Sequence, residues 1–224
     1  QVRVLIAAGV YACALMAVGS RLFLHAFPAL PADEQSRVAG TGALAALLGI
    51  VLVLLQWPLQ AAYLGGSSLQ AALDPVLLVM VYDSPQGDRL LLAVGGLALL
   101  LAAMPTRHAP AWIGRLLGPA GIALVLLAFV QVGHTRGEPR LLLASLLALH
   151  LFAVSFWLAA LPPLSRLAGV QDTAMAARVL GRFGRIGLLI VPLLLVAGLI
   201  LAWLLLGGIA PLFTTAYGQL LLGK

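Results

Sequence analysis

The sequence contains very little charge, and this scarcity excludes a globular protein dissolved in water. Only 9% of its 224 residues are charged, whereas 62% are hydrophobic. Soluble domains have about 25% charged residues, so the polar side chains here are too few to cover a surface exposed to water. The composition therefore predicts an all-α polytopic membrane protein whose partner is the lipid bilayer.

Cysteine and catalytic motifs are scarce as well. Cys13 is the single cysteine, which allows no intrachain disulfide and no CxxC metal or redox site. The sequence has no nucleophile elbow, phosphate-binding loop, HExxH motif or pair of carboxylates, so we expect no enzymatic activity. No basic patch is interleaved with aromatic residues, and we therefore expect no nucleic-acid partner. The net charge of +6 is interpreted as a signal for lipid headgroups and topology.

Acidic residues are absent from the interior of the long apolar runs. The seven acids lie in loops or at the ends of these runs, at Asp33, Glu34, Asp74, Asp83, Asp88, Glu138 and Asp172. Proton- and sodium-coupled transporters generally place carboxylates within the membrane. This distribution argues against a carboxylate-coupled antiporter.

Long apolar runs are abundant, and they predict a helical bundle with about six spans. The runs cover residues 4–24, 42–64, 90–104, 116–132, 141–163 and 186–206. Residues 75–82 form an apolar piece that is too short to span, and we expect it to be re-entrant or to lie in the membrane interface. The loops after the odd-numbered spans carry eight arginines, whereas the other side carries five basic residues. Because cytoplasmic loops are enriched in Arg and Lys, this bias predicts an N-terminus outside.

Two parts of the chain resemble each other, and we interpret them as a parallel internal repeat. The segment RVAG at 37–40 matches RVLG at 178–181, and each precedes a span with an internal proline and a final Leu-Gly-Gly step. We expect a single membrane domain made of a first unit, 1–133, and a second unit, 134–224. The second unit is shorter than the first, so we expect a chain truncated from about eight spans.

Histidine supplies the strongest candidates for a functional site. His150 lies near the middle of the fifth run, where lipid offers no hydrogen-bond partner. An intramembrane ionisable residue is a functional-site hypothesis, and neutral imidazole is a ligand for copper, zinc, iron and haem. His134 lies just before the same run. The alternative is that His150 bonds a carbonyl on a neighbouring helix for packing alone and that His134 is simply exposed to solvent.

Soft donors are few. Met16 and Cys13 in the first run and Met80 in the short apolar piece suit Cu(I), although core packing is the alternative for each of them.

Arg178, Arg182 and Arg185 follow one side of a helix and predict a helix start that binds lipid headgroups. Gly181, Gly184 and Gly187 recur at every third residue, which predicts close helix packing.

The order of several segments resembles the copper resistance protein D (CopD) family. The segment RFGR at 182–185 is followed by an apolar span, by AWLLLG at 202–207 and by TTAYGQLLL at 214–222, similar to the C-terminal signature of that family. The segment LHLFAVSFWLAALP at 149–162 resembles its histidine-bearing helix, and Gly133-His134 resembles the step that precedes this helix. Ala159 and Ala160 stand where members usually have glycines, which keeps these positions small.

The resemblance implies a bacterial inner-membrane protein of copper uptake or tolerance that works beside a periplasmic copper-binding partner of the CopC type. Our first hypothesis is that copper passes from the periplasm toward the cytoplasm, with His134 as the outer ligand, His150 as a deeper one, and Met16, Cys13 or Met80 as soft partners. The second hypothesis is a cytochrome-like electron-transfer protein in which His150 binds haem b. The third is a sensor or assembly subunit that does not transport copper.

Overall fold

The computed structural model describes residues 2–105, 111–132, 139–169, 173–206 and 213–214. Throughout these ranges the regular structure is helical, with no strand, which confirms the all-α prediction. Six of the described helices are long and apolar enough to cross a membrane. The protein is therefore a multi-pass membrane protein, as its composition predicts.

The six long helices are α1 (Val2–Ala26), α2 (Ala32–Leu64), α5 (Pro85–Ala103), α6 (Ala111–Val130), α7 (Arg140–Leu167) and α8 (Thr173–Leu206), and the short ones are α3 (Leu69–Ala72) and α4 (Pro75–Tyr82). The second and sixth predicted spans are extended at their starts. In α2 and α8 the polar and basic residues before the apolar run are also helical, so each helix projects beyond the apolar segment.

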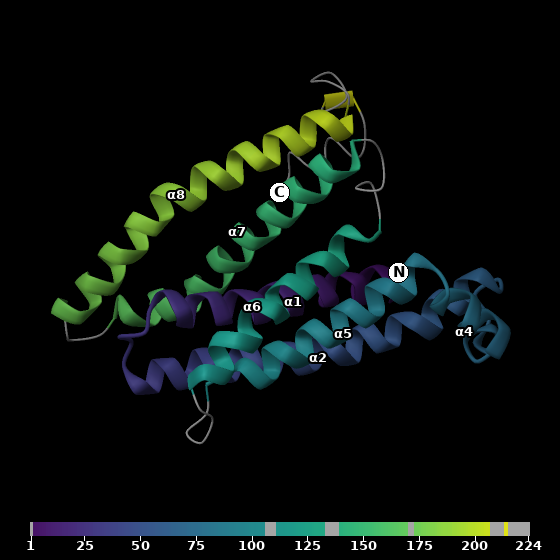
Figure 1. Cartoon of the computed structure of the whole chain (residues 1–224), viewed down its shortest axis with the longest axis horizontal. Helices are drawn as coiled ribbons and strands as arrows, with labels where there is room; N and C mark the ends of the chain where they lie inside the picture. The colour runs from purple at the N-terminus through teal and green to yellow at the C-terminus, as the bar shows by residue number, and fades with distance from the viewer. Residues whose placement is uncertain (1, 106–110, 133–138, 170–172, 207–212, 215–224) are drawn as a thin grey trace.

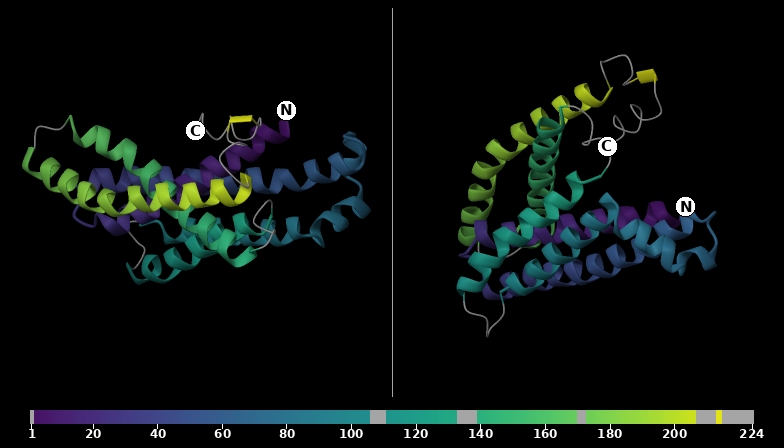
Figure 2. Two further views of the ribbon diagram at one scale, coloured as in Figure 1. Left: turned by 90° about the horizontal axis from the view of Figure 1, so that it is seen from above. Right: turned by 45° about the vertical axis from the view of Figure 1, so that its right-hand side comes forward.

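The long helices form two parts (Figures 1 and 2). The four-helix bundle consists of α1, α2, α5 and α6, which lie side by side. The α7–α8 hairpin rises obliquely from it, with α7 against α1 and α8 on the outer side of α7. The start of α1 lies at the same end of the molecule as α3 and α4, which we call the α4 end. The connection between α1 and α2 lies at the opposite end, beside the start of α8.

The bundle core is built from small residues and branched aliphatic side chains. Leu97 and Leu100 of α5, Val18 of α1 and Val125 of α6 are fully buried in one cluster. A second cluster near the opposite end joins α1 to the hairpin through Phe23, Phe156 and Leu167. Burial of these side chains fixes which faces of the helices meet, because the interiors of proteins are densely packed.

Glycines set the closest helix contacts in the bundle. A Cβ at Gly96 of α5 would come within 2.8–2.9 Å of Val125 and Gly121 of α6, backbone atoms included. A Cβ at Gly19 of α1 would collide with the Ser155 carbonyl of α7. Small residues let helix backbones approach in this way.

The predicted close packing at Gly181, Gly184 and Gly187 is wrong for the described structure. A Cβ at Gly181 or Gly184 would meet no atom within 4 Å, and one at Gly187 would meet only Trp157, at 3.9 Å. No described helix approaches Gly181 or Gly184 closely, and Gly187 is only in ordinary contact with Trp157 of α7.

At the α4 end, proline and capping residues start two helices in succession. Asp74 caps α4 by accepting a hydrogen bond from the backbone N–H of Val76 at 2.8 Å, and Ser84 caps α5 in the same way. Pro75 and Pro85 occupy the first turns, where a missing N–H costs nothing. The short apolar piece is thus a helix of eight residues, and Trp57 of α2 holds it by donating a hydrogen bond to the Leu78 carbonyl at 2.9 Å.

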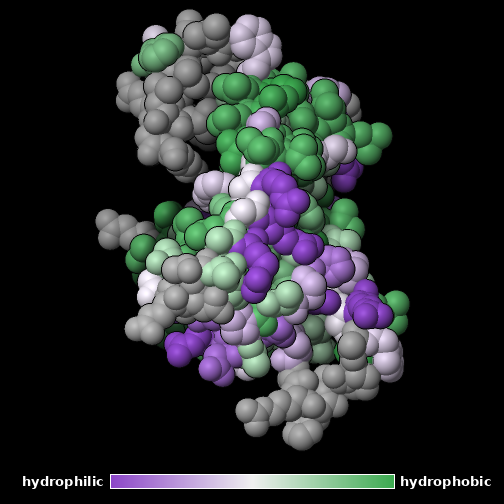
Figure 3. Space-filling model, turned by 90° about the vertical axis from the view of Figure 1, so that its left-hand side faces the viewer, coloured by the Kyte–Doolittle hydropathy of each residue, from purple (hydrophilic) through white to green (hydrophobic). Residues whose placement is uncertain are grey.

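The opposite end is rich in arginine and carries an ion pair between the two parts. Arg166 of α7 donates hydrogen bonds from Nε and Nη2 to the Glu34 carboxylate of α2 at 3.0–3.1 Å. Figure 3 looks onto this end, where hydrophilic side chains gather across the middle of the face below an apolar surface. A charged band beside an apolar surface is typical of the level of lipid headgroups.

Candidate functional site

His150 lies on the face of α7 that meets α8. Its imidazole sits against Gly198, because a Cβ built on that glycine would be 3.3 Å from Cε1 and 3.4 Å from Nδ1. Any larger residue at position 198 would press on the ring. The imidazole therefore fits between the two helices because Gly198 has no side chain.

The Nδ1 atom of His150 is buried and makes no hydrogen bond to a described residue. The backbone of Leu194, one turn before Gly198, also faces the imidazole, but it is not placed to form a hydrogen bond with Nδ1. Buried polar atoms are normally hydrogen-bonded, and an unpaired one calls for an explanation. An imidazole nitrogen without a protein partner is available to a metal ion.

Cys13 and Met16 lie on α1, within the four-helix bundle. The Cys13 side chain faces α2, since its Cβ is 3.4 Å from a Cβ built on Gly49. Met16 is partly buried and packs against the bundle core. The contacts of these two residues therefore lead into the bundle, whereas those of His150 lead to α8. No described contact brings them to His150.

Met80 and His134 stand in other places. Met80 is on α4 and is 56% exposed, at the end of the molecule where α4 packs on α2, α3 and α5. His134 falls outside the described residues. Among the described residues, no three His, Cys, Asp or Glu side chains gather where they could hold a metal ion. Of the predicted ligands that the structure describes, His150 is the one with nitrogen donors, and its Nδ1 atom is buried and unpaired.

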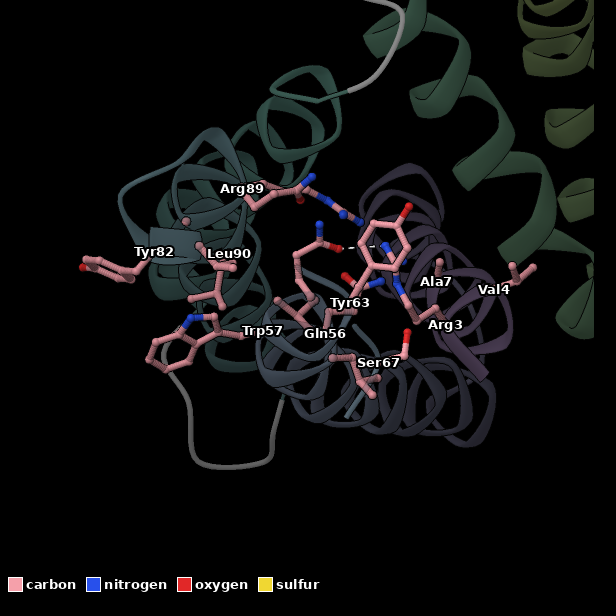
Figure 4. A pocket seen from close by; sticks show the side chains of 16 residues that line it. Arg3, Val4, Ala7, Gln56, Trp57, Tyr63, Ser67, Tyr82, Arg89 and Leu90 are labelled. Atoms are coloured by element: carbon pink, nitrogen blue, oxygen red, sulfur yellow. Dashed lines mark hydrogen bonds between the residues drawn. The ribbon is translucent and has the colours of Figure 1, made fainter. Parts of the chain in front are cut away.

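A cavity of about 620 Å³ opens at the α4 end and was not foreseen from the sequence. It is enclosed by the start of α1, the second half of α2, the turn after α2 and the start of α5. In Figure 4 the side chains of Arg3 and Arg89 point toward one another from opposite sides, near Tyr63. Arg3 donates a hydrogen bond to Oε1 of Gln60 at 2.8 Å, and its guanidinium carbon lies 3.9 Å from the centre of the Tyr63 ring.

The sequence carries only a weak signal for this cavity. Arg3 and Arg89 are predicted on the same side of the membrane, but they are 86 positions apart, and nothing in their local sequence pairs them. Gln60 and Tyr63 belong to one apolar run and appear there as isolated polar residues. Helix packing is what brings α1, α2 and α5 around one space.

A second cavity of about 560 Å³ lies at the opposite end, between the start of α8 and the connection from α1 to α2. Arg178, Arg182 and Arg185 all line it, opposite Phe27 and Leu30. The guanidinium carbon of Arg182 lies 5.8 Å from the centre of the Phe27 ring. The three arginines thus share one recess, and their role in binding lipid headgroups stays a prediction.

Comparison with known proteins gives one family. Residues 177–224 match the family model described as copper resistance protein D. This is the same family that the segments at 182–185, 202–207 and 214–222 resemble. The matched region includes α8 from its second turn onward, together with residues outside the described ranges. Curated proteins gave no match, and solved structures gave none. The CopD match and the six candidate spans together support a membrane protein of copper resistance.

Proposed function

We propose that this protein handles copper in the bacterial inner membrane, carrying the ion from the periplasmic side toward the cytoplasm. The observation that carries the proposal is the buried, unpaired Nδ1 atom of His150 at the α7–α8 contact, in a chain whose C-terminal region matches a copper resistance family. Copper binds imidazole nitrogen readily. The role is non-enzymatic, because the ion would leave chemically unchanged.

His150 is the deep ligand in this proposal, and His134 is the outer one. The N-terminus is periplasmic, in accord with the eight arginines of the odd-numbered loops and the positive-inside rule. Met16, Cys13 or Met80 would be a soft partner for Cu(I) elsewhere on the path, since no described contact brings any of them to His150. A conducted ion must be bound weakly enough to leave, which a site with few ligands allows. A periplasmic copper-binding protein of the CopC type would deliver the ion.

The test is copper binding by the full chain purified in detergent, under anaerobic conditions with Cu(I) and a competing chelator. His150→Ala should weaken the binding at least about tenfold, the size of loss seen when metal sites are perturbed. His25→Ala is the matched control, because His25 is exposed at the end of α1 and should leave copper affinity unchanged.

Three outcomes would overturn the proposal that His150 is a copper ligand. Equal copper affinity in the His150→Ala variant and the unsubstituted chain would leave the histidine as a packing residue, as expected for a sensor or assembly subunit. A Soret absorption band that disappears in His150→Ala would instead indicate a haem b protein. Absence of both copper binding and the Soret band in the unsubstituted chain would also reject the proposal.

Transport itself is measured separately. The full chain in liposomes of defined orientation should accumulate copper on the side that corresponds to the cytoplasm, and His150→Ala should slow this uptake. Uptake that proceeds at the same rate in liposomes without protein would reject transport while leaving copper binding intact.

A further inference from the structure

The cavity at the α4 end is lined by positive charge, with no acidic residue among the described side chains that line it. Its lining includes Arg3 and Arg89 and no Asp or Glu. Arg3 is partly satisfied by Gln60 and Tyr63. The Arg89 guanidinium has neither a hydrogen bond nor an ion pair with a described residue. Its central carbon lies 6.0 Å from the centre of the Phe129 ring, and Tyr11 is also close enough to interact with its charge.

Two guanidinium groups that converge without a counter-ion repel one another, and the repulsion is stronger in a half-buried space than in water. Bringing an anion between them would relieve this repulsion and satisfy the free N–H groups. The position is also accessible, because the cavity is open toward the outside of the bundle, where Figure 4 shows the two side chains meeting near the Tyr63 ring.

We propose that this cavity binds a phosphate group, held between Arg3 and Arg89. A tetrahedral phosphate can accept hydrogen bonds from two guanidiniums on opposite sides at once, whereas a planar carboxylate uses both oxygens on a single guanidinium fork. Gln60 orients Arg3 for this contact through its bond to Nη2. The site shares no residue with the proposed copper site, so it is independent of the proposed function.

The volume of about 620 Å³ is within the range of about 300–1,000 Å³ for small-molecule sites and far exceeds that of a bare phosphate. The remaining space is lined by Trp57, Tyr63 and Tyr82, and Trp and Tyr are the aromatic residues found at the level of lipid headgroups. The phosphate could belong to a phospholipid of the outer leaflet or to a soluble phosphate ester. Both sources present the same group to the two arginines.

Native mass spectrometry of the detergent-purified full chain distinguishes these sources. Phosphatidylglycerol, phosphatidylcholine and glycerol 3-phosphate are added separately, to the unsubstituted chain and to Arg89→Gln and Arg3→Gln. We expect phosphatidylglycerol to bind and each substitution to weaken it about tenfold, as for loss of one charge-assisted contact. Equal binding of glycerol 3-phosphate, with the same dependence on Arg89, would assign the site to a soluble ester.

Arg37→Gln is the matched control, because it removes an exposed arginine that lines neither cavity. Phosphatidylglycerol binding that is lost in Arg37→Gln and retained in Arg89→Gln would overturn the proposal, as would the absence of binding of any of the three probes. Arg89→Lys retains the charge and should keep part of the affinity, which separates loss of the contact from loss of the fold. Copper affinity should be the same in Arg89→Gln and the unsubstituted chain, so this test and that of the copper site can fail separately.

Discussion

The four-helix bundle and α8, the outer helix of the hairpin, are buried to different extents. In the helices of the bundle 28–39% of the most apolar window is buried, and α7 has 28%, whereas in α8 the share is 17%. Leu188 and Leu189 of α8 are each 76% exposed, while Leu97 and Leu100 of α5 are fully buried. Since lipid tails are as apolar as leucine, such exposure costs little in a bilayer.

The two candidate sites therefore differ in how many helices surround them. The cavity at the α4 end is enclosed by three helices of the bundle, the end of α4 and the turn after α2. His150 instead lies between two helices, against Gly198 and near the backbone of Leu194 on α8. The copper site that we propose is therefore held by the less buried part of the molecule, where helices can shift with smaller loss of packing.

The largest effect on stability is expected in the bundle. Gly96→Ala should lower the free energy of unfolding by about 1–3 kcal/mol, the usual cost of overpacking, because its Cβ would press on backbone atoms of α6. Gly95→Ala is the control, since a Cβ there would lie 3.9 Å from Leu124. The measurement is thermal unfolding in detergent, and equal stability of the two variants would refute close packing of α5 on α6.

The link between the two parts should contribute the next largest effect. Glu34→Gln should cost about 1–2 kcal/mol, the worth of hydrogen bonds to a charged group, because Glu34 is only 13% exposed and accepts from Arg166. Asp33→Asn is the control, as Asp33 is an exposed acid in the same first turn of α2 and has the same relation to the helix dipole. Unfolding of both variants at one temperature would show that the ion pair does not join the hairpin to the bundle.

A smaller effect is expected at the hairpin contact itself. Gly198→Ala adds a methyl group 3.3 Å from the His150 ring, which must move by a few tenths of an ångström. If His150 binds copper, affinity should fall by less than about tenfold, or about 1 kcal/mol, while the fold is retained. Gly184→Ala on the same helix is the control. A copper affinity equal in both variants would place the metal away from the α7–α8 contact.

The smallest effect should come from Gly184→Ala. A Cβ there meets no atom within 4 Å, so the change should only favour the helix, by about 0.5 kcal/mol. The measurement is again thermal unfolding in detergent, beside Gly96→Ala. A clear loss of stability would reveal that this face of α8 packs against another molecule, for example a second copy of the chain.

The sequence alone was sufficient for the membrane class, the number of spans and the presence of an apolar piece at 75–82 that is too short to span. These features depend on the length of apolar runs relative to the bilayer. The position of His150 within a helix long enough to span was predicted in the same way. The structure added that the piece at 75–82 is a helix, capped by Asp74 and with Pro75 in its first turn. The family match over residues 177–224 agrees with the resemblance of the segments at 182–185, 202–207 and 214–222.

Only the tertiary structure decided which helices meet and which side chains converge. Gly19 and Gly96 make close contacts, whereas Gly181 and Gly184 make none, although all four are glycines in apolar helices. The convergence of Arg3 with Arg89 and of His150 with Gly198 has the same origin. Because hydrophobicity does not select helix partners inside a bilayer, the pairing is fixed by the fit of small residues and polar groups across distant segments, which hydropathy along the chain does not encode.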